Sequence, residues 1–219
     1  MKIKTIAVSS TLLLLAACTH AQAATECLFS ATMDVDLKYA DTLVVDLSNK
    51  NTPETGYASV SAEIPFQTSQ NIKSTCNSGK EGQILQGKNT APTEDMHDYT
   101  EVNNQQVLMY RTDIKGLFYG IKIINGECAN LSGYLPPDQS FTNLYDVGDD
   151  NEKYCMKNDT PWKFSLQFFI DSDYSYASGK SFHSAMSTSH GKFRLSGSIG
   201  DVEPRTITLK TIQFDGQVK

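Results

Sequence analysis

The stretch W-K-F-S-L-Q-F-F-I at residues 162–170 places an apolar side chain at every second position. Because neighbouring side chains of an extended chain point to opposite faces, this period of two indicates a strand with one buried face. The same alternation, or a short apolar run, recurs at residues 33–38, 43–47, 58–64, 106–112, 117–124, 193–199 and 206–218. Such strands, separated by Gly, Pro, Asn and Asp, predict an all-β chain folded as an antiparallel sandwich.

Composition limits the class of protein. The chain has 219 residues, of which 39% are hydrophobic and 20% charged, and its formal net charge is −6. This apolar content is too high for a disordered chain, and the size fits one domain or two small ones. Nucleic acid is not expected as a partner, because the acidic chain has no cluster of Lys and Arg. No window favours a helix, and the polar segments 68–99 and 135–157 are expected to be long loops.

The N-terminus has the pattern of a secretion signal. Lys2 and Lys4 precede a twelve-residue apolar run, Ile6–Ala17, which is shorter than the ~20 residues of a membrane span. Small residues before Ala24 predict a signal peptide over residues 1–23. The short motif that ends at Cys18 also fits the processing site of a bacterial lipoprotein, in which this cysteine is lipidated. Because no second apolar run of that length follows, no transmembrane anchor is expected.

Cleavage after Ala23 would leave four cysteines, which are Cys27, Cys76, Cys128 and Cys155. An even number in an exported chain predicts two disulfides, and four cysteines allow three pairings. We favour the sequential pairs Cys27–Cys76 and Cys128–Cys155, because adjacent strands bring near neighbours together. No two cysteines have the C-x2-C spacing of zinc sites, and no histidine lies near them, so neither a metal nor a cofactor is expected.

Catalytic patterns are weak. His183 and His190 flank a serine-rich segment, but such spacing is typical of a solvated loop, and the G-x-S-x-G motif is missing from the sequence. Carboxylates are numerous, yet glycosidase chemistry requires two of them at a defined separation across a cleft. We therefore do not expect an enzyme.

Two acidic segments have the composition of a sugar-binding site. Carboxylates accept pairs of hydrogen bonds from sugar hydroxyls, and an aromatic ring packs on the apolar face of the sugar. An ordinary solvated loop has the same composition, and the D-x-D-x-D-G spacing of a calcium loop is missing from the sequence. The candidate ligand-binding residues are Tyr145, Asp146, Asp149 and Asp150 in the first segment and Asp171, Asp173 and Tyr174 in the second.

Both ends of the chain resemble a known family. The C-terminal segment 207–218 ends in I-x-F-x-G-x-V, which is similar to the donor-strand motif of chaperone–usher fimbrial subunits. Residues 110–123 resemble a hairpin of the tip adhesins of these fimbriae, and Cys27 follows Ala24 too closely to leave room for an N-terminal donor strand. The chain therefore resembles the N-terminal receptor-binding domain of a tip adhesin, and the donor-strand-like residues are Ile207, Leu209, Ile212, Phe214, Gly216 and Val218.

This resemblance implies an immunoglobulin-like or jelly-roll-type sandwich over residues 24–205, followed by a C-terminal strand over 206–219. That strand is either a donor strand or linker, or simply the last strand of the same sandwich. The implied function is attachment of a bacterium to host glycans or surface proteins. The implied partners are a periplasmic chaperone, an outer-membrane usher and other fimbrial subunits, at the cell surface. The alternatives are a structural fimbrial subunit that acts by strand exchange and an outer-membrane lipoprotein lipidated at Cys18.

Overall fold

A computed structural model describes residues 27–66, 70–76, 84–127, 131–146, 159–184, 189–196 and 203–219. Apart from one 3-10 turn, η1 (Thr93–Asp95), the regular structure of these residues consists of β-strands. The prediction of an all-β chain is therefore confirmed. No helix in these ranges is long and apolar enough to cross a membrane.

Nine strands form the largest sheet: β1 (Cys27–Phe29), β4 (Ala58–Ser59), β5 (Ile64–Phe66), β6 (Lys73–Cys76), β8 (Met96–Val102), β9 (Gln105–Arg111), β10 (Leu117–Asn125), β11 (Ser132–Tyr134) and β13 (Thr160–Ile170). Their order is β1-β6-β13-β10-β9-β8, with β11 beside β10, and with β4 and β5 beside β13. The predicted 162–170 strand is thus all of β13 except its first two residues, and β13 pairs with β10 over nine residue pairs.

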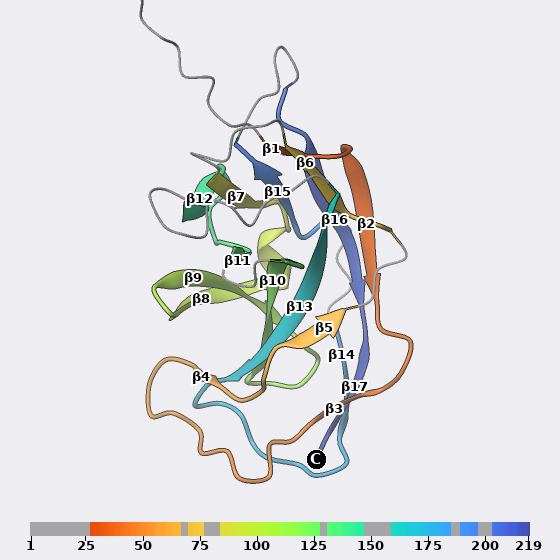
Figure 1. The fold of residues 1–219 in the computed structure, drawn as a ribbon. Coiled ribbons are helices and arrows are strands. Elements are labelled where there is room, and N and C mark those ends of the chain that lie inside the picture. The colour runs from red at the N-terminus through yellow and green to blue at the C-terminus, as the bar shows by residue number, and fades with distance from the viewer. Residues whose placement is uncertain are drawn as a thin grey trace, which may run out of the picture.

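The opposite layer contains two smaller sheets. The first has the order β12 (Thr142–Asp146), β7 (Ile84–Asn89), β15 (Gly191–Leu195), β16 (Thr206–Gln213) and β2 (Met33–Lys38). The second has the order β14 (Ser181–His183), β17 (Asp215–Val218) and β3 (Leu43–Val45). Figure 1 shows that β17 continues the line of β16, so the two sheets lie end to end.

Aromatic side chains from both layers meet in the core. Phe164 of β13 lies 5.9 Å from Phe193 of β15, and Phe168 lies 5.5 Å from Phe182 of β14, measured between ring centroids. Each of these four side chains is fully buried. The alternation in the sequence therefore points toward one shared core, as a sandwich requires.

The C-terminal segment crosses the second layer in two pieces. Strand β16 lies between β15 and β2, and β17 lies between β14 and β3. The pairs β16–β2 and β17–β3 are parallel, whereas the sequence predicted antiparallel pairing throughout. Parallel neighbours need a long connection, and here that connection is most of the chain, because β2 and β3 are near its start and β16 and β17 at its end.

Two segments that were predicted to be loops contain strands, so this prediction was wrong. Strands β6, β7 and the start of β8 lie within residues 68–99, and β12 lies within 135–157. Their sequences are polar because these strands are short or expose much of one face. Pairing with distant partners stabilises them, such as Thr142–Asp146 with Ile84–Gly87, and this contribution cannot be read from local composition.

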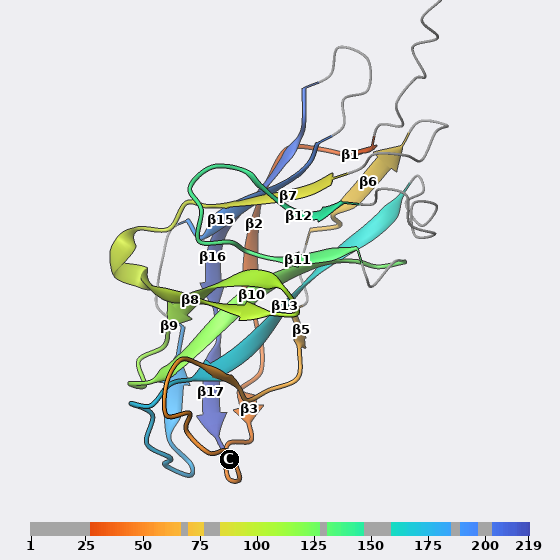
Figure 2. The ribbon, with the colours of Figure 1, turned by 90° about the vertical axis from the view of Figure 1, so that its left-hand side faces the viewer.

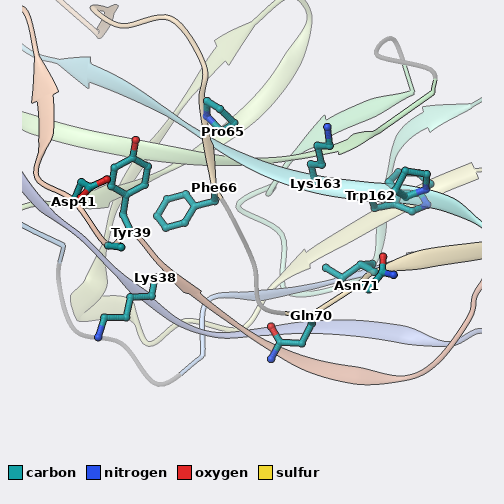
Figure 3. Close-up of a pocket in the computed structure, with 12 residues that line it drawn as sticks. Lys38, Tyr39, Asp41, Pro65, Phe66, Gln70, Asn71, Trp162 and Lys163 are labelled. Atoms are coloured by element: carbon teal, nitrogen blue, oxygen red, sulfur yellow. The ribbon is translucent and has the colours of Figure 1, made fainter.

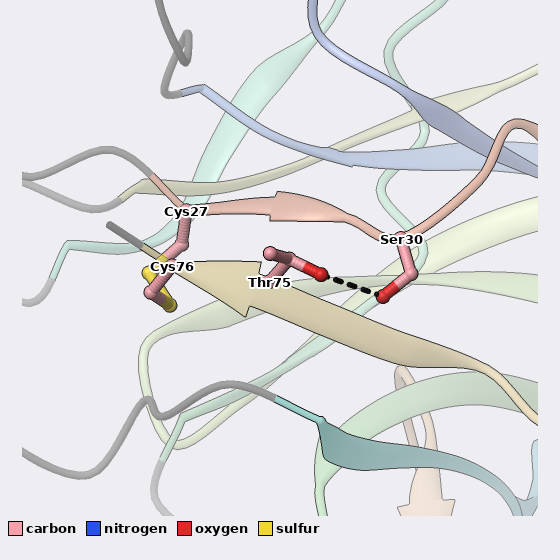
Figure 4. The surroundings of a disulfide bond; sticks show 4 residues. All are labelled: Cys27, Ser30, Thr75 and Cys76. Atoms are coloured by element: carbon pink, nitrogen blue, oxygen red, sulfur yellow. Dashed lines mark hydrogen bonds between the residues drawn. A yellow bond between two sulfur atoms is a disulfide. The ribbon is translucent and has the colours of Figure 1, made fainter. Parts of the chain in front are cut away.

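A disulfide joins the first described strand to the large sheet. Cys27 of β1 and Cys76 of β6 are directly paired across the two strands and bonded through their sulfur atoms (Figure 4). At the other end of this pair, Ser30 and Thr75 share a hydrogen bond of 3.0 Å between their hydroxyl oxygens. The predicted Cys27–Cys76 pair is confirmed, whereas Cys128 and Cys155 lie outside the described residues.

Loss of this disulfide is expected to destabilise the fold. The bond closes a loop between residues separated by 49 positions, and a loop of that length corresponds to about 4 kcal/mol of unfolded-state entropy. A chain with both Cys27→Ala and Cys76→Ala should therefore unfold in urea with a free energy lower by about this amount. An unchanged unfolding midpoint would contradict this expectation.

Gly216 of β17 is expected to tolerate no side chain. A Cβ atom at this position would overlap the ring of Phe182, which is itself fully buried against Phe168 and Phe214. Gly216→Ala should therefore lower the free energy of unfolding by about 1–3 kcal/mol, the usual cost of overpacking. The exposed neighbour Gln217 serves as a control, because Gln217→Ala should leave the urea midpoint almost unchanged.

Candidate functional site

A broad groove lies along one edge of the sandwich, and we call it the edge groove. It has a volume of about 940 Å³ and lies between the end of β2 with its following turn on one side and, on the other, β5, residues 70–72 just before β6, and the start of β13. Figure 3 shows the side chains around it. Its lining residues are Lys38, Tyr39, Ala40, Asp41, Pro65, Phe66, Gln70, Asn71, Ile72, Pro161, Trp162 and Lys163.

The position of the groove follows from the pairing of the strands. Among the described strands, β2 is the last of its sheet and is paired with β16 alone. Strand β5 belongs to the opposite layer and is paired with β13. Because no backbone ladder joins the edges of two packed sheets, the layers can separate here. The Tyr39 ring lies between them, in an edge-on contact with Phe66 at 5.7 Å between centroids.

The floor of the edge groove is part of the core. Phe66, Ile72 and Trp162 are at most 4% exposed, and the Trp162 ring packs edge-on against Phe29 at 5.3 Å. Trp162 lies on the alternating apolar face of residues 162–170, and its burial confirms that this face is turned to the core. Tyr39, which is only partly buried, is therefore the aromatic side chain that a ligand in the groove can reach.

The rim of the edge groove is polar, and four of its side chains have no partner among the described residues. Lys38, Asp41, Asn71 and Lys163 are exposed. Within the part of the chain that the structure describes, none of their side chains makes a hydrogen bond or an ion pair. Their two ammonium groups, one carboxylate and one amide are thus free to donate to and accept from a ligand. Together with the Tyr39 ring, they form the usual chemical set for binding a sugar.

The first acidic segment lies only partly within the described structure. Tyr145 and Asp146 belong to β12, where their backbones pair with Leu85 and Ile84 of β7. Asp149 and Asp150 lie outside the described residues. The sequence-based interpretation of this segment as a binding loop therefore stays a prediction.

The second acidic segment forms a turn that is held by internal contacts. The Asp171 carboxylate accepts a hydrogen bond of 2.9 Å from the backbone N–H of Asp173, and Asp173 forms an ion pair of 3.0 Å with Lys115. Tyr174 is 5% exposed, so its ring is part of the core and is not presented to solvent. A Cβ atom on Gly116, at φ +75°, would meet the backbone of Tyr174, so the turn also packs tightly against the β9–β10 connection.

The described part of the first acidic segment lies far from the second acidic segment. Asp171 follows the last residue of β13, whereas β12 lies near the other end of that strand, beside β7 (Figures 1 and 2). The 11 residues of β13 span roughly 33 Å. The backbone of residues 145–146 is therefore far from the turn that begins at Asp171, and Asp171, Asp173 and Tyr174 do not line the edge groove.

Sequence reasoning missed the edge groove. The available signal was the Tyr39-Ala40-Asp41 segment, in which an aromatic and an acidic residue directly follow an alternating strand. The residues opposite it come from positions 65–72 and 161–163, and only the tertiary structure brings these three segments together.

The donor-strand-like residues take part in the chain's own sandwich. Five of them, Ile207, Leu209, Ile212, Phe214 and Val218, are at most 4% exposed. Gly216, the sixth, is paired with Phe182 on one side and Leu43 on the other. In this structure the segment is paired on both edges by strands of the same chain.

The histidines flanking the serine-rich segment have structural partners. His183 Nδ1 lies 2.7 Å from Asp215 Oδ1, and the neighbouring Ser184 hydroxyl donates to the Ile212 carbonyl at 2.8 Å. His190 is fully buried, with Nε2 lying 3.4 Å from the Tyr119 hydroxyl. Among the described residues, no group of three or more His, Cys, Asp and Glu side chains is placed to hold a metal ion.

Comparisons with known proteins give matches among solved structures. The ambient-temperature fimbriae adhesin AtfE of Proteus mirabilis is 13% identical at a TM-score of 0.42, over 86% of this chain and 99% of that chain. The receptor-binding domain of the adhesin MrkD1P of Klebsiella pneumoniae is 11% identical at a TM-score of 0.37, over 89% and 96%. The CupB6 tip adhesin of Pseudomonas aeruginosa is 13% identical at a TM-score of 0.37, over 84% and 52%.

All three of these similar structures are adhesins. No protein-family model matches the chain. No curated protein matches it. Because the TM-scores are low, we base the function on the residues of this chain.

The acidic surface around Asp171 gives a prediction for stability at high pH. The Tyr57 hydroxyl donates to Asp98 at 3.3 Å. Burial, the charge and hydrogen bond of Asp98, and the charge of Asp171 raise the pKa of Tyr57 from 10.0 to about 12. Because the folded state holds this proton more tightly, the resulting stabilisation is present below pH 10 and is lost as the pH rises to 12. Tyr57→Phe should therefore flatten the fall in the free energy of unfolding across this window.

The measurement is urea unfolding at a series of pH values, with Tyr99→Phe as the control. Tyr99 is 51% exposed on β8, and its substitution should leave the slope unchanged. Equal slopes for the wild type and Tyr57→Phe would show that this phenol does not contribute.

Proposed function

We propose that the chain is the receptor-binding module of a fimbrial adhesin. It attaches a bacterium to host surface glycans or proteins by binding alone, without catalysis. We further propose that the ligand lies in the edge groove, between the exposed rim and the Tyr39 ring.

The observation that carries this proposal is the lack of internal partners on the rim. Asp41 and Asn71 are exposed and make no side-chain hydrogen bond within the described residues. In the turn after β13, by contrast, Asp171 and Asp173 are engaged by a backbone N–H and by Lys115. A ligand at the rim gains hydrogen bonds without breaking internal ones, whereas a ligand at the turn must compete with them.

Assembly and location follow from the motifs of the chain. The signal-peptide pattern supports export, and the fimbrial resemblance of residues 110–123 and 207–218 supports assembly with a periplasmic chaperone, an outer-membrane usher and other subunits. We propose the same division of the chain as the sequence predicted, with a binding sandwich over 24–205 and a terminal strand over 206–219.

A second candidate location for the ligand is the acidic segment 145–152. Asp149 and Asp150 supply two carboxylates there, next to Tyr145 and Asp146. This location is a competing hypothesis for the same function, and one set of variants distinguishes the two.

The test is a glycan-array screen of the chain purified from a bacterial periplasm, followed by titration of the best glycan. Asn71→Ala and Lys163→Ala should each weaken binding about fivefold to tenfold, because each removes one hydrogen bond to the ligand. Asn51→Ala and Tyr99→Ala are the matched controls, since both residues are exposed and lie outside the lining of the groove. Both controls should retain wild-type affinity.

Other outcomes reassign the site or the function. If the double variant Asp149→Ala and Asp150→Ala loses binding while Asn71→Ala does not, the ligand lies in the acidic segment. If the folded chain binds no glycan, the glycan receptor is excluded, and binding to host surface proteins becomes the measurement. Turnover of a bound glycan would contradict the non-catalytic mode.

A further inference from the structure

A second, smaller hollow adjoins the edge groove. It has a volume of about 340 Å³ and lies where β16 passes into β17, at the end of β14. Its lining residues are Lys38, Tyr39, His183, Ser184, Gln213, Phe214 and Asp215. Lys38 and Tyr39 line both hollows, so the end of β2 lies between the two.

The junction between the hollows is held in place by the backbone. The N–H of Tyr39 donates to the Gln213 carbonyl at 2.9 Å, which fixes the end of β2 beside the end of β16. The Tyr39 ring is held on its other side by Phe66. A ligand that passes from one hollow to the other must therefore contact Tyr39 and the exposed Lys38 side chain.

The second hollow has a fixed set of hydrogen-bonding groups. The backbone N–H of His183 donates to Asp113 Oδ1 at 2.7 Å, and its ring Nδ1 lies 2.7 Å from Asp215 Oδ1. Because a carboxylate only accepts, Nδ1 carries a proton in this contact, and Nε2 is left to bond with a ligand. The amide of Gln213 is exposed and makes no hydrogen bond within the described structure.

We propose that the two hollows are subsites of one binding site, and that the ligand is an oligosaccharide longer than a disaccharide. Its main part lies in the edge groove, and its further units cross Tyr39 into the hollow of His183, Gln213 and Asp215. This inference rests on the proposed glycan-binding function. The edge groove alone is near the upper limit of the ~300–1,000 Å³ that proteins use for one small ligand, so a single sugar unit would leave most of it unfilled.

Filling the second hollow should add affinity. Sugar units joined to one already bound gain contacts without a second loss of overall translational and rotational freedom. The exposed Gln213 amide, the second oxygen of Asp215 and Nε2 of His183 are groups that donate to or accept from sugar hydroxyls. Affinity for the ligand is therefore expected to increase with its length until both hollows are occupied.

The experiment is a titration of the full chain with length series of N-acetyllactosamine, mannose and galactose oligomers, from the monosaccharide to the tetrasaccharide. In the series that binds, the tetrasaccharide should bind at least about tenfold more tightly than the disaccharide. Gln213→Ala should weaken tetrasaccharide binding about fivefold and leave disaccharide binding unchanged. Asn71→Ala, in the edge groove, should weaken both.

The matched control is Gln217→Ala, which removes the same side chain from β17 at a position outside both hollows. Circular dichroism and the urea midpoint of each variant show whether the fold is retained. Equal affinity for disaccharide and tetrasaccharide, with no effect of Gln213→Ala, would overturn the two-subsite inference and leave the proposed function intact. No binding at any length would overturn the inference together with the glycan receptor.

Discussion

Contacts of the Phe214 ring join the two layers of the sandwich at the point where the C-terminal strand bends. Its centroid lies 5.1 Å from Tyr119 and 5.6 Å from Phe168, both in the large sheet, and 6.1 Å from Phe182 in its own layer. All three contacts are edge-on, a geometry favoured for aromatic pairs. Because Phe214 connects β16 to β17, this cluster fixes both strands, and through parallel pairing it also fixes β2 and β3.

The location of the edge groove follows from this arrangement. Strands β2 and β3 occupy the outside of the C-terminal strand, so they form the border of their layer. Across from them, β4 and β5 form the border of the opposite layer beside β13. The space between these borders has a floor of core side chains and a polar rim, where Lys38, Asp41, Asn71 and Lys163 have no side-chain partner among the described residues. Folding and ligand binding therefore depend on different residues of one groove.

The sequence predicted the strands whose apolar residues alternate. It did not predict the strands that form because of their hydrogen-bonded partners and not because of their own sequence pattern. Residues 162–170 were predicted correctly because the alternation of their own apolar residues is enough to indicate a strand with one buried face. Strands β6 and β12 form only because distant strands supply their hydrogen-bond partners, and composition does not record this. The same limit applies to the site: the acidic residues were visible in the sequence, whereas the edge groove combines three segments that only the tertiary structure brings together. The sequence likewise did not show that Asp171 and Asp173 are engaged in contacts within the chain.

Residues at the rim also limit the addition of a strand from another chain at this edge of the sandwich. An exposed border strand presents unpaired backbone groups to which another chain can add, and proteins limit this with charged side chains and proline. Here Lys38 ends β2, and Pro65 is the central residue of β5, on opposite sides of the edge groove. Both positions disfavour strand addition and leave the groove open to a ligand that needs no backbone ladder. The polar and charged side chains that disfavour strand addition at this border are therefore also suited to bind a polar, ring-shaped ligand such as a sugar.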